Sequence, residues 1–238
     1  MERNTKGSLW AGLGLLLAFA LWTALVCRVD VRQVGPMGSS VGFAALNTAF
    51  HRLSGVHMAL YTLTDWLGLV PVGVCAFFGV LGLVQLFRRK RLRLVDPDLL
   101  LLGIYYLLVI AAYLLFEAVP INYRPILIEG RLEASYPSST TLLVLSVMPT
   151  LKLQLDRRSK QAAVRTFAGA FAVLFSAFMV VGRLISGVHW VTDIVGAVLL
   201  GLGLFFIYRY GVACSDRRGG EAGWNSMKSC RNCANARG

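Results

Sequence analysis

Residues 183–193 read "RLISGVHWVTD" and lie between two apolar runs, at about 166–182 and 191–210. Each run is close to the roughly 20 residues of helix that cross a bilayer. Three ionisable residues, Arg183, His189 and Asp193, fall within this short stretch. Ionisable groups at the edge of a hydrocarbon layer are costly unless they are paired or hydrated. The sequence therefore predicts two membrane helices joined by a turn that carries chemistry.

The composition of the whole chain is that of a membrane protein. Hydrophobic residues make up 56% of its 238 residues and charged residues 15%, against about 45–50% and about 25% in ordinary soluble domains. We therefore expect an all-α fold, an integral membrane bundle of six transmembrane helices. The fourth apolar run is shortened by Pro149 and Lys152. The six runs lie at about 8–27, 66–87, 98–116, 140–155, 166–182 and 191–210.

The first apolar run follows Arg3 and Lys6, so a signal peptide is an alternative to a membrane helix. The run is longer than the roughly 7–15 apolar residues of a signal peptide, and no small-residue cleavage site precedes the next charges. We expect it to remain as an anchor.

The basic residues predict the orientation. With the N-terminus in the cytoplasm, 18 of the 24 Lys and Arg residues fall in cytoplasmic segments. The positive-inside rule selects this orientation, so both termini are expected in the cytoplasm. The cytoplasmic segments are 1–7, 88–97, 152–165 and 209–238, and the extracellular ones are 28–65, 117–139 and 183–190.

The net charge of +12 is explained by this distribution. Nucleic-acid binding is not expected, because no basic stripe is interleaved with aromatic residues. Cys230 and Cys233 form a single CxxC pair near the C-terminus, which without a second ligand pair is a weak metal or redox signal.

The chain is expected to have three parts. Residues 1–65 hold the first transmembrane helix and an outer segment, in which an amphipathic pattern predicts a helix at the membrane interface. Residues 66–210 form a membrane core, and residues 211–238 form a basic cytoplasmic tail.

His189 and Asp193 are four residues apart at the start of the sixth helix, so their side chains share one face. A carboxylate bonded to one imidazole nitrogen fixes the tautomer and leaves the other nitrogen free as a base or nucleophile. Arg183 can approach the same point across the turn at Gly187. The planar guanidinium suits an oxyanion such as phosphate. The structural alternative is a salt bridge among Arg183, Asp193 and lipid headgroups.

A second polar segment is expected on the same side of the membrane. It contains Arg124 followed by Pro125, and a "PSS" turn that enters the fourth helix. Ser138 and Ser139 are expected to cap that helix with their hydroxyl groups while its N-terminal amides face an anion. A phosphate would then meet two arginines and one helix N-terminus.

The pattern R-x5-H-x3-D, preceded by an R-P pair and a P-S turn on a six-helix membrane protein, resembles the type 2 phosphatidic acid phosphatase family, which is related to the vanadium haloperoxidases. The resemblance covers roughly residues 60–210. It implies that His189 attacks phosphorus to form a phosphohistidine, that Asp193 orients it, and that Arg124 and Arg183 hold the phosphoryl oxygens. The substrate would be a phosphorylated lipid.

Three residues depart from the family's motifs. Glu117 stands where the first motif has lysine, Gly182 where the third has serine, and Thr140 where the second has the histidine that protonates the leaving group. A threonine hydroxyl cannot act as a general acid near neutral pH, and such an acid typically contributes about 10²–10⁴-fold. We therefore hypothesise a preference for lipid diphosphates such as polyprenyl diphosphates over phosphatidic acid, because a leaving phosphate needs the proton less.

Another group could supply the proton instead. His51 and His57 lie on the predicted outer side, although both also fit interfacial histidines that bond water or headgroups. A glutamate with a raised pKa could also serve, and the available ones are Glu117, Glu129 and Glu133. Glu117 is expected to pair with Arg124 or Arg131.

The function expected from these residues is a plasma-membrane lipid phosphatase, a phosphoric-monoester or acid-anhydride hydrolase with its active site on the extracellular side. A phosphotransferase with a lipid alcohol as acceptor, and a catalytically weak protein that binds phosphorylated lipid, are the alternatives. A transporter is disfavoured because the apolar runs lack ionisable residues deep inside. No metal ion or cofactor is expected, since two arginines and a helix N-terminus supply the positive field. The oligomeric state is left open.

Overall fold

The computed structural model describes the backbone of residues 2–235 and the side chains of residues 5–217. Within residues 2–235 the chain is largely helical and forms no β-strand. The expected all-α membrane bundle is thereby confirmed. The side chains of Cys230 and Cys233, the predicted CxxC pair, lie outside the described residues.

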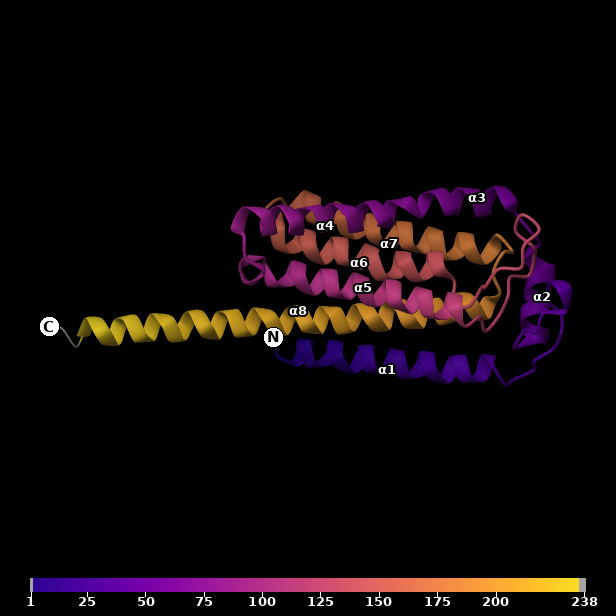
Figure 1. Cartoon of the computed structure of the whole chain (residues 1–238), viewed down its shortest axis with the longest axis horizontal. Coiled ribbons are helices and arrows are strands. Elements are labelled where there is room, and N and C mark those ends of the chain that lie inside the picture. The colour runs from indigo at the N-terminus through magenta and orange to yellow at the C-terminus, as the bar shows by residue number, and fades with distance from the viewer. Residues whose placement is uncertain (1, 236–238) are drawn as a thin grey trace.

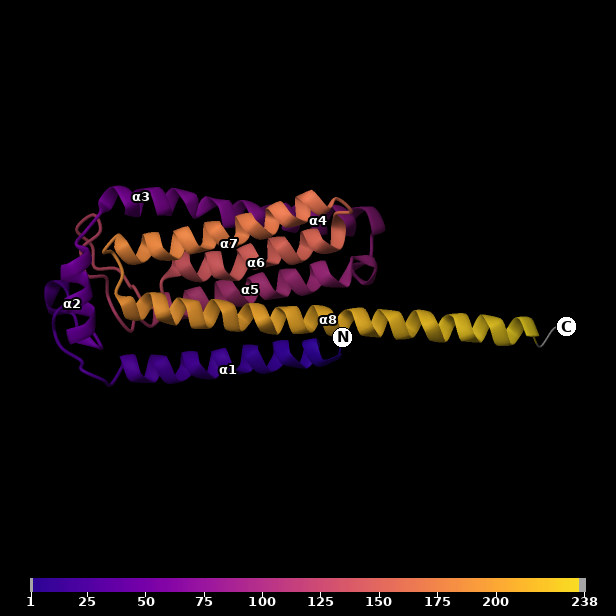
Figure 2. The same ribbon diagram turned by 180° about the vertical axis from the view of Figure 1, so that it is seen from behind.

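The long helices run side by side along the long axis of the molecule (Figure 1). Helix α1 lies at one edge and packs on α8, an arrangement also visible from behind (Figure 2). Short 3₁₀ turns occupy Pro36–Gly38 and Leu92–Leu94. The α-helices are α1 (Glu2–Val26), α2 (Ala44–Ser54), α3 (Met58–Leu67), α4 (Leu69–Arg89), α5 (Pro97–Ala118), α6 (Ser139–Arg158), α7 (Ala162–Ile185) and α8 (Val191–Asn235).

Five of the six expected spans are long and apolar enough to cross a membrane. They are Thr5–Val26, Met58–Arg89, Pro97–Ala118, Ala162–Ile185 and Val191–Arg217. The fourth expected span is α6, which lies along the bundle between α5 and α7 (Figure 1) but is less apolar than the others. It is the helix that its neighbours surround, so its polar residues are shielded from lipid.

Hydrogen bonds between helices hold the backbone of α6 at Ser146 and satisfy two of its polar side chains, Thr150 and Gln154. The Tyr105 hydroxyl donates to the Ser146 carbonyl oxygen at 2.9 Å. The Thr150 hydroxyl lies 2.7 Å from that of Tyr106, and the Gln154 amide donates to the Tyr208 hydroxyl at 2.7 Å. Buried polar groups that are bonded in this way cost little, because each bond replaces one that water would make. Composition alone therefore underestimates how well α6 fits the interior of a membrane bundle.

The second span begins at Met58 rather than at residue 66, because α3 continues almost directly into α4. The polar residues Thr64 and Asp65, which precede the expected start, do not interrupt the helix. The Thr64 hydroxyl bonds the carbonyl of Leu60 within its own helix, and the Asp65 carboxylate pairs with Arg183. Helix α2 lies across one end of the bundle (Figure 1), in the segment where an interfacial helix was expected.

The last helix extends further than expected. Its predicted apolar run ends at residue 210, whereas α8 continues to Asn235, through most of the predicted tail. The turn that carries His189 and the loop that carries Arg124 both lie at the end of the bundle covered by α2, away from the N-terminus (Figure 1).

Candidate active site

His189 lies in the turn between α7 and α8, and its side chain is almost entirely buried. Its Nδ1 is 3.7 Å from Oδ2 of Asp193, one helical turn further along. Neither ring nitrogen of His189 has a hydrogen-bond partner within the described part of the chain. The expected pairing of the two side chains on one face is therefore observed, and it leaves Nε2 free to react with a ligand.

The carboxylate of Asp193 is completely buried and is held by two donors. Its Oδ2 accepts the backbone N–H of Trp190 at 2.9 Å, and its Oδ1 accepts the side-chain amide of Asn122 at 3.2 Å. Among residues 5–217, no ion pair joins Asp193 to Arg183, which pairs with Asp65 instead. The alternative of an Arg183–Asp193 salt bridge is therefore wrong. Asp193 is instead fixed to orient the imidazole.

Burial lowers the pKa of His189 to about 4. The positive charges of Arg124 and Arg183 lower it as well, while the neighbouring carboxylate of Asp193 acts in the opposite direction. At neutral pH the imidazole is therefore uncharged, which is the form that can act as a nucleophile.

Arg183 is fully buried at the end of α7 and binds residues of two other helices. Its Nη2 donates to the hydroxyl of Thr140 at 2.5 Å and to Oδ1 of Asp65 at 3.1 Å. Its guanidinium also lies over the ring of Tyr61, 4.9 Å from the centroid. Asp65 and Tyr61 were not expected at the site, because they lie about 120 residues earlier in the chain.

Arg124 approaches the same place from the loop between α5 and α6. Its guanidinium carbon lies 5.8 Å from the centre of the Tyr61 ring, so the two arginines share one aromatic neighbour. Its Nε is 3.0 Å from Oε2 of Glu133. Its Nη1 is buried and has no partner within the described residues. One donor of Arg124 is thus available to an anion.

The expected pairing of Glu117 with Arg124 is wrong. The loop folds back on itself, and the backbone N–H of Arg124 donates to the carbonyl oxygen of Glu133 at 3.0 Å. This hairpin places Glu133, rather than Glu117, beside the guanidinium. No ion pair joins Glu117 to Arg131 in the part of the chain that the structure describes either.

The turn into α6 is close to the expected arrangement, with one correction. Ser138 takes the N-cap position, but its hydroxyl makes no capping bond to the helix backbone. It donates instead to the hydroxyl of Thr141 at 3.1 Å, while the Ser138 backbone N–H donates to the carbonyl oxygen of Asp193 at 3.2 Å. Ser139 lines a cavity, and its hydroxyl makes no hydrogen bond to another residue among those that the structure describes.

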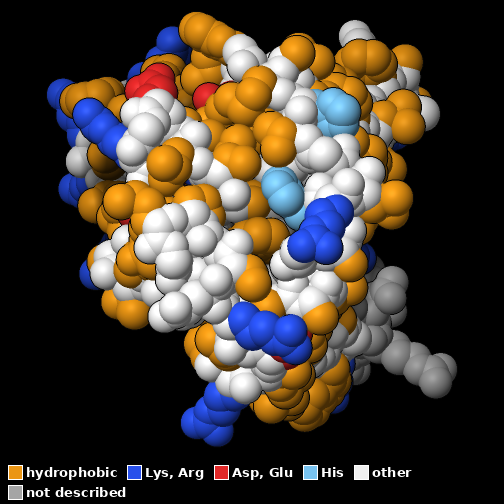
Figure 3. Space-filling view, turned by 90° about the vertical axis from the view of Figure 1, so that its right-hand side faces the viewer, with side chains coloured by type: hydrophobic (Ala, Val, Ile, Leu, Met, Phe, Trp, Pro, Cys, Tyr) orange, Lys and Arg blue, Asp and Glu red, His pale blue; other side chains and the backbone are white. Residues whose placement is uncertain are grey.

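Of the auxiliary residues, Thr140 is committed to Arg183. His57 is exposed, and its Nε2 lies 2.8 Å from the carbonyl oxygen of Ser54. His51 packs on Trp190, with the two rings 5.6 Å apart, and burial lowers the pKa of its imidazole. Histidine side chains also reach the surface at this end of the molecule, among hydrophobic and basic ones (Figure 3). His51 and His57 do not line the cavity in front of His189.

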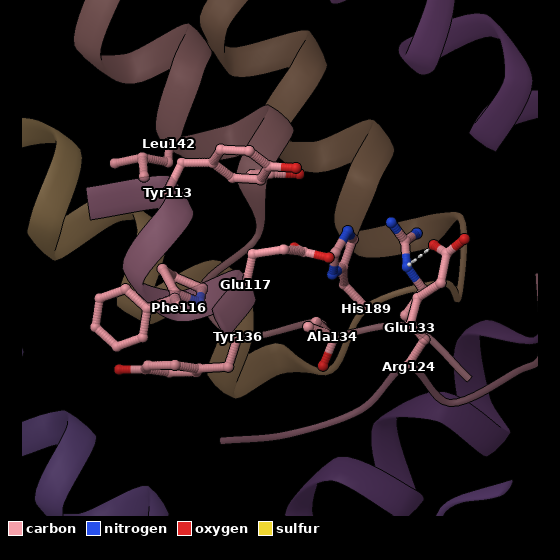
Figure 4. Close-up of a pocket in the computed structure, with 12 residues that line it drawn as sticks. Tyr113, Phe116, Glu117, Arg124, Glu133, Ala134, Tyr136, Leu142 and His189 are labelled. Carbon is pink, nitrogen blue, oxygen red and sulfur yellow. Dashed lines mark ion pairs between the residues drawn. The ribbon is translucent and has the colours of Figure 1, made fainter. Parts of the chain in front are cut away.

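That cavity has a volume of about 240 Å³. His189, Arg124 and Glu117 all reach it, and the carboxylate of Glu117 points toward His189 (Figure 4). Its full lining is Tyr113, Phe116, Glu117, Arg124, Glu133, Ala134, Ser135, Tyr136, Pro137, Ser139, Leu142 and His189. A second, largely apolar cavity of about 320 Å³ lies next to it and shares Tyr113, Ser139 and Leu142. The polar cavity has the donors and the nucleophile that a phosphoryl group requires.

Two further residues support the site without reaching the cavity. Asn122 also donates to the hydroxyl of Thr192 at 3.4 Å, and the Asn47 amide donates to the same hydroxyl at 3.0 Å. Both asparagines are buried. They connect α2, the α5–α6 loop and the start of α8, so the position of Asp193 depends on three separate parts of the chain.

Comparisons with known proteins agree with this site. Residues 117–215 match the family model described as the PAP2 superfamily. That segment contains Arg124, Arg183, His189 and Asp193. No curated protein matches the chain.

Among solved structures, the chain is similar to one described as the first transmembrane PAP2 type phosphatidylglycerolphosphate phosphatase from Bacillus subtilis. The identity is 20%, the TM-score is 0.55, and the alignment covers 84% of this chain and 94% of that one. At this identity the match shows the fold. The resemblance inferred from the motifs is confirmed by the PAP2 superfamily model, which matches residues 117–215.

Proposed function

We propose that this protein is a membrane lipid phosphatase that acts through a phosphohistidine at residue 189. The observation that carries the proposal is the geometry of His189. It is buried, paired with Asp193 at 3.7 Å, and faces a 240 Å³ cavity that Arg124 also reaches. A protein that only binds phosphorylated lipid would need the arginines but has little use for a His–Asp pair.

The first chemical step is the transfer of the phosphoryl group. Nε2 of His189 attacks phosphorus, an N–P bond forms, and the P–O bond to the leaving group breaks. Asp193 stabilises the imidazolium that develops, and Arg124 balances the negative charge of the phosphoryl oxygens from the cavity wall. Arg183 does not line the cavity, and its buried positive charge acts on the site from behind His189. Water then attacks phosphorus, the N–P bond breaks, and inorganic phosphate is released. If a lipid alcohol replaces water, the same intermediate gives phosphotransfer.

The substrate class is a phosphorylated lipid of the polyprenyl diphosphate or phosphatidate type. The apolar cavity beside the polar one supports a substrate with a hydrocarbon part. The superfamily match and the similarity in fold to the Bacillus subtilis phosphatase support the same class. A leaving phosphate is a weaker base than an alkoxide and needs a proton less, and the hydroxyl of Thr140 is too weak an acid to supply one near neutral pH. We therefore expect the diphosphate to react faster.

We also propose that the site faces the extracellular side of the plasma membrane, with both termini in the cytoplasm. The support is the excess of basic residues in the segments at the opposite end of the bundle from the site.

The test is phosphate release by the purified protein in detergent from phosphatidate and from farnesyl diphosphate. His189→Ala is expected to abolish release from both lipids while lipid binding is kept, because the arginines remain. Binding of these lipids without any release by the unaltered protein would instead establish the catalytically weak alternative. Faster release from phosphatidate would contradict the expected preference for diphosphates.

A further inference from the structure

Glu117 occupies the last turn of α5, and its carboxylate enters the cavity in front of His189 (Figure 4). We propose that Glu117 is the general acid of this enzyme, which protonates the leaving group in the first step and takes a proton from water in the second. The proposal rests on the proposed function and deepens it, because it assigns the role that Thr140 cannot fill.

Other candidate donors near the cavity are already engaged. Thr140 accepts a hydrogen bond from Arg183 and lines only the neighbouring apolar cavity. His57 is exposed and its ring is bonded to the carbonyl of Ser54. Glu133 is paired with Arg124, and Asp65 with Arg183. The two paired carboxylates would have to leave their arginines before they could carry a proton, and the Thr140 hydroxyl is too weak an acid to transfer one.

Glu117 differs from these residues. Within residues 5–217, no hydrogen bond or ion pair joins its carboxylate to another side chain, although it lines the same cavity as Arg124 and His189. It lies at the end of a helix, beside Phe116, with its carboxylate directed into the cavity (Figure 4). A carboxyl group in this position is free to exchange a proton with a ligand.

The charges around the cavity explain how Glu117 could gain a proton. A bound phosphoryl group brings negative charge next to the carboxylate, and like charges at short range favour the neutral acid. The single cation that lines the cavity, Arg124, is already shared with Glu133. The titratable groups that line this cavity are Tyr113 and Glu117 from α5, Arg124, Glu133 and Tyr136 from the following loop, and His189.

Over the two steps, Glu117 gives up one proton and takes one back. In the first step the Glu117 carboxyl proton moves to the leaving oxygen as the P–O bond breaks, so the lipid departs as a neutral alcohol and Glu117 becomes a carboxylate. In the second step that carboxylate takes a proton from the attacking water as the new P–O bond forms. His189 is released unmodified, and Glu117 is again protonated.

Leaving-group dependence provides the test. Glu117→Gln preserves the size of the side chain but removes the proton donor. The leaving group of phosphatidate is a strongly basic alkoxide unless it is protonated, so kcat/KM for this lipid is expected to fall about 10²–10⁴-fold. For farnesyl diphosphate, which releases a weakly basic phosphate ester, the fall is expected to be much smaller. The ratio kcat/KM is the appropriate quantity because it covers only the steps up to departure of the leaving group.

Two control variants make the result specific. Glu129→Gln changes an exposed glutamate of the α5–α6 loop that does not line the cavity. It should leave kcat/KM for both substrates unchanged. Tyr113→Phe removes the phenolic hydroxyl, the other group of α5 at the cavity that could carry a proton to the leaving group.

The possible failures are distinguishable. An equal loss on both lipids in Glu117→Gln, or selective loss in Tyr113→Phe instead, would overturn the assignment of Glu117 while leaving the phosphatase intact. If the unaltered protein releases phosphate from neither lipid, the proposed function itself fails.

Discussion

Asp193 is held in place by the protein rather than by solvent. Its two oxygens accept the Trp190 N–H and the Asn122 amide. Asp193→Asn would put a donor where one of these donors points, so the side chain must rotate or lose a bond. Loss of the orienting carboxylate of a His–Asp pair costs roughly 10⁴-fold in kcat. We expect a loss of this order in phosphate release.

The matched control is Asp156→Asn, which changes an exposed carboxylate of α6 that pairs with Lys152 away from the site. Both variants should elute from gel filtration as the wild type does. An Asp193→Asn protein with nearly normal kcat would mean that the imidazole does not depend on this carboxylate.

His189 should be uncharged well below neutral pH. Burial holds its pKa at about 4, against about 6.5 for an exposed histidine. Its protonated form should therefore appear only as the pH falls through about 4. A variant with His51→Gln and His57→Gln keeps His189 as the one remaining histidine of the three in the sequence. NMR titration of its ring signals in the absence of lipid measures the pKa directly.

The direction of the pKa shift of His189 follows from its burial. Because burial penalises the charged ring, opening the cavity to water should raise the pKa toward 6.5. A midpoint near 6.5 in the unliganded protein would show that His189 is hydrated rather than buried.

Some site residues could be predicted from the sequence and others could not. The His189–Asp193 pair follows from a spacing of four on a helix, and Arg124 and Arg183 from the motifs. Asn122, Asp65 and Tyr61 reach the same place from distant parts of the chain, and no local spacing marks them. The signal for Asn122 was a polar residue just before the Arg124–Pro125 pair, although polarity alone does not distinguish a loop residue from a support of Asp193.

At the scale of elements, the turn between α7 and α8 determines where His189 lies. Gly187 adopts a positive φ of 71°, and a Cβ there would lie 2.1 Å from the carbonyl oxygen of Gly55. The turn is also bonded to the segment before α3, since the His57 N–H donates to the Ser186 carbonyl oxygen at 3.0 Å. The two connections pack against each other through backbone atoms.

Gly187→Ala should therefore destabilise the protein and displace His189. A left-handed backbone costs an alanine about 1–2 kcal/mol, and the forced shift of Gly55 adds to this. We expect a lower midpoint of thermal unfolding in detergent, together with a loss of phosphate release. Gly73→Ala is the control, because a Cβ at this exposed helical glycine meets no atom within 4 Å. An equal effect of both substitutions would indicate that glycine flexibility, rather than the close packing at Gly187, is what matters.

Helix α6 illustrates why elements are only partly predictable. Its position was expected from an apolar run at 140–155, and the structure extends it to Ser139–Arg158. Its polar residues could not be interpreted from the sequence, because their partners, Tyr105, Tyr106 and Tyr208, belong to α5 and α8. The expected capping by Ser138 failed for a similar reason, since Thr141 competes for its hydroxyl.

At the scale of the whole molecule, the two ends of the bundle differ in character. The site, α2 and the long loops occupy one end, and the α4–α5 and α6–α7 connections occupy the other (Figure 1). Those two connections lie in the basic segments 88–97 and 152–165. Short connections rich in Lys and Arg stay in the cytoplasm as a rule. Because the site lies at the opposite end of the bundle, the charge distribution predicts that the site faces the extracellular side.

Cysteine labelling in intact cells tests this sidedness. In a background with the natural cysteines replaced by serine, Glu129→Cys places a thiol on the exposed α5–α6 loop, and Lys160→Cys places one on the exposed α6–α7 connection. A membrane-impermeant maleimide should label Glu129→Cys in intact cells and Lys160→Cys only after permeabilisation. The reverse pattern would place the site in the cytoplasm, in which case the basic segments would have been translocated against their charge. Since the two reporters are single substitutions in the same background, each variant serves as the other's control for expression and folding.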